Sequence, residues 1–422
     1  MNHQKRSPWA WVPSLYFAEG IPYVIAATTF ALIMYKRLGM SNADAALYTS
    51  WLYLPWVIKP FWSPFVDIMK TKRWWIIAMQ FLIGAGLAGV AFCIPTDFWL
   101  QSTLAILWLV AFGSATHDIS ADGFYTLALN DNQQSLFVGI RSTFYRISMI
   151  VGQGALVMLA GYLEEKTNNI PISWSITFLI SAGIFLALAV YHFFVLPKPN
   201  NDQSVQGKEP IKSFFSSFGS FFTKQGILLS LAFILLFRLG EAQLTKIATP
   251  FLLDSLEAGG LGLSTKEIGF AYGTVGVVAL TLGGILGGIM AAKDGLRKWL
   301  LPMALAMNVP NLLYVFMAYT QPESYSLICA FVAIEQFGYG FGFTAFMLYL
   351  IYISRGEYAT SHYAICTGFM ALGMMLPGRV AGQIEEFLGY SHFFVWVCLC
   401  TIPGIILAMI LKIDPSFGKK EE

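Results

Sequence analysis

The chain has 422 residues, of which 56% are hydrophobic, 16% aromatic and only 12% charged, and its mean hydropathy is +0.62. Soluble domains carry about 25% charged residues, so this composition excludes an ordinary soluble enzyme, a disordered chain, a nucleic-acid-binding domain and a disulfide-rich module. Because a bilayer core about 30 Å thick takes about 20 apolar residues per helix, the length fits an all-α polytopic membrane protein with short loops. The net charge of +2 identifies no partner by itself.

Apolar segments in chain order predict twelve transmembrane helices. They lie at 10–35, 45–66, 74–94, 100–129, 139–163, 172–196, 226–253, 268–291, 299–319, 325–354, 363–384 and 392–413. We therefore predict an N-terminal six-helix bundle over 1–196, a cytoplasmic linker over 197–225 and a C-terminal six-helix bundle over 226–422. In the linker, phenylalanines at helical spacing predict a helix lying in the membrane interface; they are Phe214, Phe215, Phe218, Phe221 and Phe222.

The distribution of Lys and Arg predicts the orientation of the chain. If the N-terminus is cytoplasmic, seventeen of these residues fall in cytoplasmic segments and four on the opposite side. Cytoplasmic loops of membrane proteins carry the excess of positive charge. We therefore expect both termini on the cytoplasmic side.

Three pairs of short segments repeat between the two halves of the chain. Their offsets are 221 to 227 residues, and they pair Leu38–Ser41 with Leu261–Ser264, Ala160–Glu165 with Ala381–Glu386, and Asp67 with Asp294. Such offsets indicate two six-helix halves of the same orientation, which is the parallel repeat of the major facilitator fold. In that fold the substrate site lies near the midplane between the halves.

Ten Asp, Glu, Lys and Arg residues lie more than two residues inside the predicted spans, where each is costly unless it faces a cavity or a partner. Five are acidic and five basic: Glu19, Asp118, Asp122, Glu241, Glu335, Lys59, Arg146, Arg238, Lys246 and Arg379. This balance indicates a paired, water-accessible polar centre. We predict that substrate is bound by Glu19, Tyr23, Lys59, His117, Tyr145, Arg146, Arg238, Glu241, Lys246 and Glu335.

These substrate-binding assignments have structural alternatives. Arg238 and Glu241 could form an intrahelical pair at i, i+3 spacing. His117 could be a hydrogen-bonding residue beside the cavity, and the tyrosines could pack in the core instead of stacking on a sugar ring.

Asp118 and Asp122 are four residues apart and share one face of a helix. Two carboxylates about 6 Å apart in a low dielectric resist joint ionisation. This favours a role in proton coupling for the pair, and we assign Glu241 to the same role. The alternative is that one aspartate pairs permanently with Lys59 or Arg146.

Short turns after the second and eighth spans carry an acid beside basic residues. Asp67 with Arg73 and Asp294 with Arg297 are predicted to hold the cytoplasmic side shut during transport. The alternative is that these basic residues only follow the positive-inside distribution. No nucleotide-binding Gly-Lys-Ser/Thr loop and no metal-ligand cluster occurs in the sequence, so we expect no metal and no cofactor.

Several of these motifs together resemble those of the muropeptide permeases (AmpG-type) of Gram-negative bacteria, a family of the major facilitator superfamily. The resemblance rests on Phe17–Pro22, Lys59–Asp67 with its Trp-Ser-Pro element, Gly113–Asp118 with Asp122, Tyr145-Arg146, Arg238–Glu241, and Glu335 before the run ending at Phe346. It extends from the first predicted span to the twelfth.

The resemblance implies a proton-coupled importer of GlcNAc-1,6-anhydro-MurNAc, with or without its stem peptide, for peptidoglycan recycling. Its partners would be this substrate, protons and membrane lipid, and it would act as a monomer in the bacterial inner membrane by alternating access. Eukaryotic acetyl-CoA transporters belong to the wider family, so a large anionic metabolite is the alternative substrate. A receptor built on the same fold is a further alternative, whereas no nucleophile–base pair in the sequence indicates an enzyme.

Overall fold

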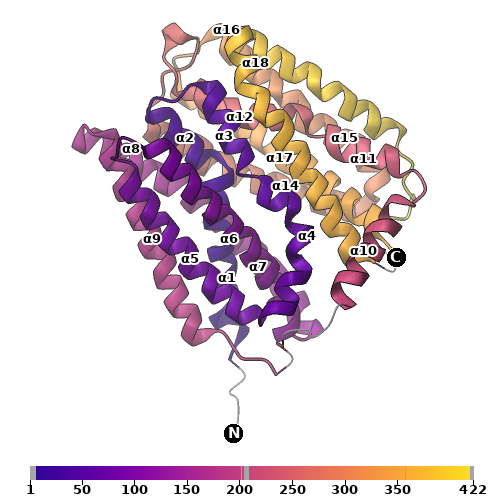
Figure 1. Ribbon diagram of the computed structural model, residues 1–422. Helices are drawn as coiled ribbons and strands as arrows, with labels where there is room; N and C mark the ends of the chain where they lie inside the picture. Colours follow the sequence, from indigo (N-terminus) through magenta and orange to yellow (C-terminus); the bar gives the residue numbers. More distant parts are fainter. Residues whose placement is uncertain (1–5, 201, 204–208, 357, 419–422) are drawn as a thin grey trace. The chain divides into compact units, whose positions relative to one another are not determined.

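The computed structural model describes residues 6–200, 202–203, 209–356 and 358–418, and the ribbon is almost entirely helical (Figure 1). The α-helices are α1 (Val12–Ala27), α2 (Thr29–Arg37), α3 (Asn42–Trp51), α4 (Leu54–Met69), α5 (Lys72–Cys93), α6 (Trp99–Ala128), α7 (Asp131–Met149), α8 (Val157–Thr167), α9 (Ile170–Val195), α10 (Glu209–Phe222), α11 (Ile227–Leu236), α12 (Leu239–Leu253), α13 (Thr265–Ile268), α14 (Val277–Asp294), α15 (Leu296–Asn308), α16 (Leu312–Thr320), α17 (Tyr325–Ser354) and α18 (Ala359–Ile410). Two π-helical segments, Ile150–Leu156 and Gly269–Gly276, join α7 to α8 and α13 to α14.

The transmembrane helices agree with the sequence prediction once their breaks are counted. Among the described residues, nine helical stretches are long and apolar enough to cross a membrane, and the pair α1 and α2, bent by 40°, makes a tenth. The 52-residue α18 contains two predicted spans, because Gly389 at φ 70° interrupts its helical backbone. The remaining predicted span, 45–66, is divided into α3 and α4. The all-α membrane fold is therefore confirmed.

The chain forms two compact units. The first unit comprises Met1–Met34 and Ile58–Phe214, and the second comprises Tyr35–Val57 and Phe215–Glu422. The second unit thus includes α3, which lies early in the sequence. The polar residues described below fall into separate clusters within these units.

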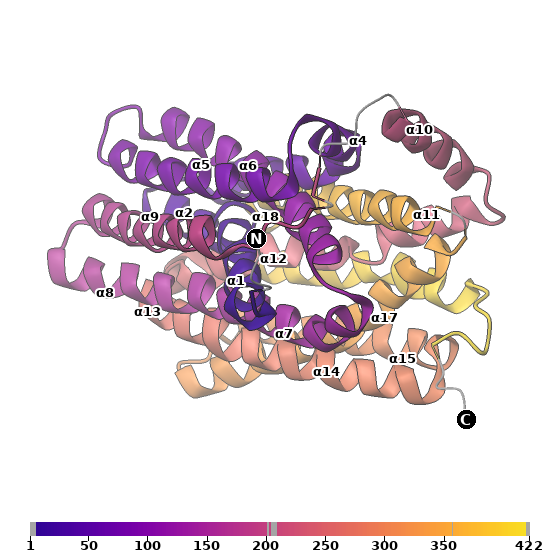
Figure 2. The same cartoon turned by 90° about the horizontal axis from the view of Figure 1, so that it is seen from below.

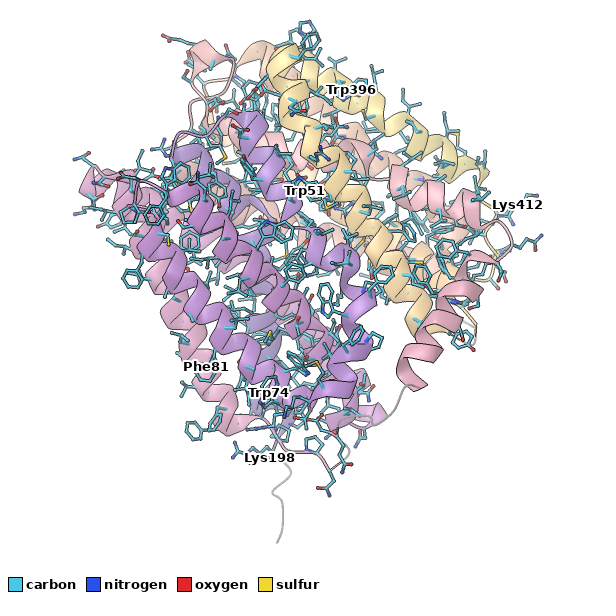
Figure 3. The ribbon with its side chains drawn as sticks, in the orientation of Figure 1. Trp51, Trp74, Phe81, Lys198, Trp396 and Lys412 are labelled. Carbon is cyan, nitrogen blue, oxygen red and sulfur yellow. The ribbon has the colours of Figure 1, made fainter. Side chains whose placement is uncertain are left out.

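In the first unit, α5 packs against α6 and α9, and α1 packs against α6 and α7. Both ribbon views show α5 and α9 running side by side (Figure 2). The buried core near the start of α1 includes Trp11, whose ring meets Phe124 of α6 edge-on at 5.3 Å. On the outer face of α5, Trp74 and Phe81 are exposed (Figure 3), as suits side chains that face lipid.

In the second unit, α14 and α15 pack against α17, while α3, α11 and α12 pack against α18. The approach of α14 to α17 depends on glycine. A Cβ on Gly283 would overlap the carbonyl oxygen of Phe337, and a Cβ on Gly340 would overlap that of Leu280. Small residues at these positions let the two backbones touch, which drives helix association in lipid.

The helix predicted in the linker is present as α10, Glu209–Phe222. Phe221 is fully buried in the core of the second unit, and its ring lies 5.5 Å from that of His362. Phe222 contacts Phe369 at 6.2 Å between ring centroids. The side chains of Phe214 and Phe215 lie outside the described residues. At least part of the aromatic face of α10 therefore packs on protein.

Candidate functional site

A polar cluster in the first unit gathers residues from α1, α4, α6 and α7; we call it the N-cluster, and its members are Tyr16, Glu19, Lys59, Asp118, Asp122 and Arg141. Asp122 lies 2.8 Å from the guanidinium of Arg141 and accepts a hydrogen bond of 3.1 Å from the hydroxyl of Tyr16. The Arg141 guanidinium also lies 4.4 Å from the centroid of the Tyr16 ring. Asp122 is therefore held by a cation and a hydroxyl together.

The other carboxyls of the N-cluster share one lysine. Lys59 Nζ lies 3.5 Å from Asp118 Oδ2. Glu19 is 8% exposed, and its Oε2 has no hydrogen-bond partner among the described residues. Its carboxyl nevertheless interacts electrostatically with Asp118, Asp122, Lys59 and Arg141. Three acids and two bases thus form one interacting group.

Local sequence brings Glu19 to this position. Gly20 follows it, and a Cβ there would overlap the Ser148 hydroxyl of α7, so glycine allows α1 to lie against α7. Tyr145 and Arg146 precede Ser148 on α7 and are half-buried. Tyr145 interacts electrostatically with Tyr23 and with Glu19. The predicted residues Glu19, Tyr23 and Tyr145 are therefore neighbours.

His117, next to Asp118 in sequence, belongs to a different hydrogen-bonded chain. Its Nε2 lies 2.9 Å from Nε2 of Gln80, whose Oε1 is 2.9 Å from Nδ1 of His192. Nε2 of His192 lies 2.9 Å from the Ser14 hydroxyl. Since the Gln80 amide nitrogen donates, Nε2 of His117 accepts. His117 is fully buried within this series of hydrogen-bonded side chains from α1, α5, α6 and α9. This matches its structural alternative as a hydrogen-bonding residue.

A second polar cluster lies within the second unit; we call it the C-cluster, and its members are Arg238, Glu241, Tyr272, Glu335, Gln336 and Tyr339. Arg238, in the break between α11 and α12, donates a 2.6 Å hydrogen bond to the hydroxyl of Tyr339. Its guanidinium also lies 4.9 Å from the centroid of the Phe343 ring. The break in the helix thus places a cation against aromatic residues of α17.

The two glutamates of the C-cluster are buried almost completely. Glu241 and Glu335 are each 1% exposed. Gln336 donates a 2.9 Å hydrogen bond to Oε2 of Glu335. Oε1 of Glu335 and both carboxylate oxygens of Glu241 have no hydrogen-bond partner among the described residues. The two carboxyls interact electrostatically with each other, and Glu241 also does so with Arg238.

Lys246 of α12 lies elsewhere in the second unit. Its Nζ donates a 3.0 Å hydrogen bond to the Thr49 hydroxyl and lies 5.2 Å from the centroid of the Tyr53 ring. Lys246 is 5% exposed, and its ammonium contacts α3 at Thr49 and the break between α3 and α4 at Tyr53. Arg379 has a related contact, with its guanidinium 5.3 Å from the Trp51 ring.

The predicted cytoplasmic gate residues have local partners. Asp294 lies 3.0 Å from Lys298 Nζ and accepts a 3.0 Å hydrogen bond from the Trp299 indole. Arg73 donates to the carbonyl oxygens of Phe193 and Leu196 at the end of α9. The side chain of Asp67 lies outside the described residues, and Arg297 is exposed. Asp294 and Arg73 are thus engaged within their own units.

Several residues of these arrangements were missed in the sequence analysis. Arg141 lies at the start of the predicted span 139–163 and was counted with the cytoplasmic charges, although α7 begins ten residues before it. A polar group around Asn42 was also missed: its amide nitrogen lies 2.7 Å from Glu385 and 2.8 Å from the Tyr390 hydroxyl, while Asp254 lies 2.6 Å from that hydroxyl and 3.1 Å from Lys36. The repeat that contains Glu385 marked this region, but its chemistry was not inferred.

The residues 14–376 match the model of the Major Facilitator Superfamily, and the chain belongs to this superfamily of membrane transporters. Among the residues that the structure describes, no group of three or more His, Cys, Asp or Glu side chains is placed to hold a metal ion.

Two relatives show which transporters within the superfamily the chain is similar to. The chain is 27% identical over 416 residues to the putative transporter AmpG 4 of Rickettsia conorii, covering 94% of this chain and 95% of that protein. It is 26% identical over 404 residues to the anhydromuropeptide permease of Escherichia coli strain K12, covering 94% of this chain and 78% of that protein. The predicted resemblance to AmpG-type permeases is therefore confirmed.

Solved structures agree with the fold. A D-xylose-proton symporter superposes with a TM-score of 0.73 at 11% identity, covering 98% of this chain and 99% of that one. The nucleoside transporter NupG superposes with a TM-score of 0.70 at 14% identity, covering 94% of this chain and 96% of that one. The predicted major facilitator fold is confirmed, and the protein is a multi-pass membrane transporter.

Proposed function

We propose that the protein imports anhydro-muropeptides, GlcNAc-1,6-anhydro-MurNAc with or without a stem peptide, from the periplasm to the cytoplasm together with protons. The names of its relatives support this substrate class, and the two polar clusters support coupled transport. It would serve peptidoglycan recycling as a monomer in the bacterial inner membrane, with both termini cytoplasmic. The segments 1–196 and 226–422 would act as the two halves of an alternating-access cycle.

The observation that carries the proposal is the burial of Glu241 and Glu335 with three carboxylate oxygens that lack hydrogen-bond partners among the described residues. An isolated ionised carboxylate is costly in a low dielectric, so a proton on one of these carboxyls removes the cost. A carboxyl that is not fixed by hydrogen bonds can also release that proton when water reaches it. We therefore assign proton carriage to Glu241 and add Glu335 to the predicted residues.

Arg238 would couple the binding of substrate to the binding of a proton. Its guanidinium interacts electrostatically with Glu241, and a nearby cation in general stabilises an ionised carboxylate. When a substrate carboxylate binds Arg238, it neutralises that cation, so Glu241 is expected to take up a proton at the same time. Substrate and proton would then enter together, as symport requires.

The N-cluster would bind substrate and respond to the proton through its ion pairs. We propose that Lys59 and Arg146, with Lys246 in the second unit, contact carboxylates of the substrate, and that Tyr23 and Tyr145 stack on a sugar ring. Glu19, Glu335 and His117 remain proposed contacts to hydroxyl or acetamido groups. Asp118 and Asp122 would take part in coupling by holding or releasing their basic partners.

Closure of the transport pathway would use polar groups at the helix ends. The predicted cytoplasmic gate, Asp67 with Arg73 and Asp294 with Arg297, remains a proposal. The predicted orientation would put Lys36 on the periplasmic side, so we propose that the group around Asn42 contributes to closure there.

The test is uptake of labelled GlcNAc-1,6-anhydro-MurNAc into liposomes that contain the purified protein, with and without an inward proton gradient. The proposal expects accumulation above the external concentration only with the gradient. Equal uptake under both conditions would contradict proton coupling. Uptake of acetyl-CoA in place of the disaccharide would contradict the substrate class. Liposomes without protein serve as the control.

A further inference from the structure

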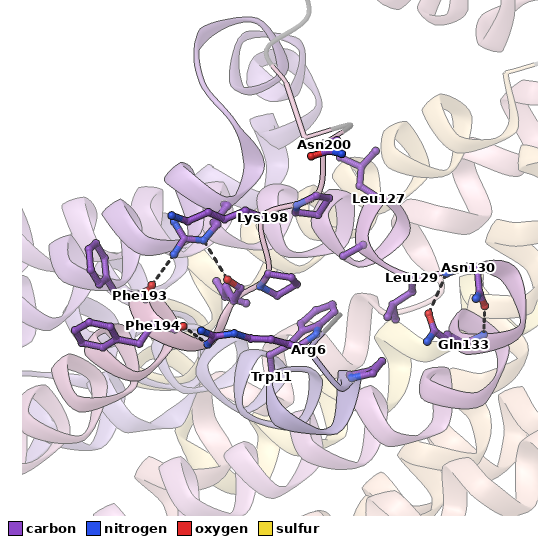
Figure 4. Close-up of a pocket in the computed structure, with 16 residues that line it drawn as sticks. Arg6, Trp11, Leu127, Leu129, Asn130, Gln133, Phe193, Phe194, Lys198 and Asn200 are labelled. Atoms are coloured by element: carbon purple, nitrogen blue, oxygen red, sulfur yellow. Dashed lines mark hydrogen bonds between the residues drawn. The ribbon is translucent and has the colours of Figure 1, made fainter. Parts of the chain in front are cut away.

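A cavity of about 1260 Å³ lies within the first unit, apart from both polar clusters. Its wall combines the N-terminal segment at Arg6 and Trp11, the start of α5 at Arg73, the end of α6 and the start of α7, and the last residues of α9 with the segment that follows it to Asn200 (Figure 4). The positive-inside distribution places these helix ends on the cytoplasmic side of the membrane.

The lining of this cavity is cationic. Arg6, Arg73 and Lys198 line it, and none of the described lining residues is acidic. Asp202 lies near it, but its carboxylate accepts the main-chain N–H groups of Lys72 and Arg73 at the start of α5, at 2.7 and 3.0 Å. The wall therefore presents three positive charges that fit a bound anion.

Two of the three cations are fixed by main-chain carbonyls. Arg6 donates to the carbonyl of Phe194, and Arg73 donates to those of Phe193 and Leu196, as the dashed lines in Figure 4 show. These bonds also satisfy carbonyls at the C-terminus of α9, which is a structural role. A guanidinium has five donors in a planar fork, so each arginine can hold a carbonyl and still donate to a phosphate.

The side of the cavity next to α9 is apolar and exposed. Phe193 is 51% exposed and Phe194 is 64% exposed. Farther along the same helix, Leu179, Ile180 and Val190 are exposed too. A cationic cavity that continues into an exposed apolar helix face fits a ligand with an anionic head and hydrocarbon tails better than it fits a small soluble anion.

We propose that this cavity binds the phosphate headgroup of an anionic phospholipid, with the acyl chains lying along the exposed face of α9. Basic pockets at the cytoplasmic ends of transmembrane helices bind such headgroups. Arg6 and Arg73 provide fixed donors, and Lys198 adds a charge at the exposed edge. The site is independent of the proposed transport function.

Substitution of Lys198 tests lipid binding without disturbing the C-terminal end of α9, because no hydrogen bond from Lys198 to α9 is among the described contacts. Lys412, exposed after α18 in the second unit, provides a matched control (Figure 3). The purified full chain in detergent is titrated with phosphatidylglycerol or phosphatidylcholine, and bound lipid is counted by native mass spectrometry. Lys198→Gln should weaken phosphatidylglycerol binding about fivefold, whereas Lys412→Gln should leave it unchanged.

Arg6→Gln gives a second variant and should weaken phosphatidylglycerol binding at least as much. Phosphatidylcholine should bind more weakly than phosphatidylglycerol to the unmodified protein and equally to all variants. The proposal is overturned if Lys198→Gln and Arg6→Gln both bind phosphatidylglycerol like the unmodified protein. It is also overturned if inorganic phosphate at the same concentration displaces the lipid, because the site would then belong to a soluble phosphate.

Discussion

The two units hold acidic side chains in different ways. In the N-cluster, Asp118 and Asp122 lie 3.5 and 2.8 Å from a basic nitrogen. In the C-cluster, Glu241 and Glu335 are each 1% exposed, and three of their four carboxylate oxygens lack a hydrogen-bond partner among the described residues. The N-cluster thus pairs its two aspartates with fixed cations, whereas the two glutamates of the C-cluster have no such ion pair among the described residues.

This difference separates two tasks that a coupled transporter needs. An ion-paired carboxylate stays ionised and holds its cation in place for a substrate. A buried carboxyl without fixed partners changes charge at lower cost, because no ion pair has to be broken first. The comparison therefore assigns substrate orientation mainly to the N-cluster and proton carriage mainly to the C-cluster.

The largest effect is expected for Glu241→Gln. Glutamine has nearly the same size but cannot take up a proton, so gradient-driven accumulation of the disaccharide should be abolished while counterflow exchange persists. Uptake and counterflow into liposomes measure the two activities. Glu257→Gln, at an exposed position of the same unit, is the control. Accumulation by Glu241→Gln at the level of the unmodified protein would contradict the assignment of proton carriage to the C-cluster.

Arg141→Gln should destabilise the first unit. The change leaves Asp122, whose side chain is 48% exposed, with the Tyr16 hydroxyl alone. A partly exposed ion pair contributes at most about 1 kcal/mol, so the midpoint of thermal unfolding should fall by a few degrees. Adding Asp122→Asn should restore part of the loss. A single variant as stable as the unmodified protein would show that the pair is not a fixed element of the N-cluster.

Tyr339→Phe tests the position of Arg238. The variant removes the hydroxyl that accepts the 2.6 Å hydrogen bond but keeps an aromatic ring. A hydrogen bond of about 1 kcal/mol corresponds to a rise in the KM for uptake of about fivefold. Tyr319→Phe, 59% exposed on α16, should leave the KM unchanged. Equal KM values for the two variants would show that the Tyr339 hydroxyl does not position Arg238 for substrate binding.

The smallest effect is expected for Asp118→Asn. The Lys59–Asp118 distance of 3.5 Å indicates a weak pair, so its loss should change the KM by roughly threefold and leave a reduced but measurable dependence on the proton gradient. Uptake at two external pH values checks this. Complete loss of pH dependence would place the proton in the N-cluster and reverse the comparison.

Most of the fold follows from local sequence, because a long apolar run can form only a helix in lipid. The positions of the breaks do not follow in the same way. Gly389, at φ 70°, lies between two predicted spans, so its turn was anticipated. The break between α3 and α4 lies inside an apolar run, just before Pro55, and α3 packs against α18.

The site was predicted by residue type but not by partner. Glu19, Glu241 and Glu335 were predicted to lie within spans at a water-accessible polar centre, and the structure buries all three. The partner of Asp122 was not predicted, because Arg141, two residues inside the start of the predicted span 139–163, was counted with the cytoplasmic charges. His117 bonds to Gln80, which no sequence spacing relates to it. Partners on different helices depend on helix packing, which a single sequence does not specify.

The most direct test of the central assignment is proton flux itself. Liposomes loaded with a pH-sensitive dye and containing the purified protein receive GlcNAc-1,6-anhydro-MurNAc with no imposed gradient, and the internal pH is followed. The account predicts that the unmodified protein acidifies the interior as the disaccharide enters, and that Glu241→Gln moves the disaccharide without acidification. Acidification by Glu241→Gln equal to that of the unmodified protein would contradict it.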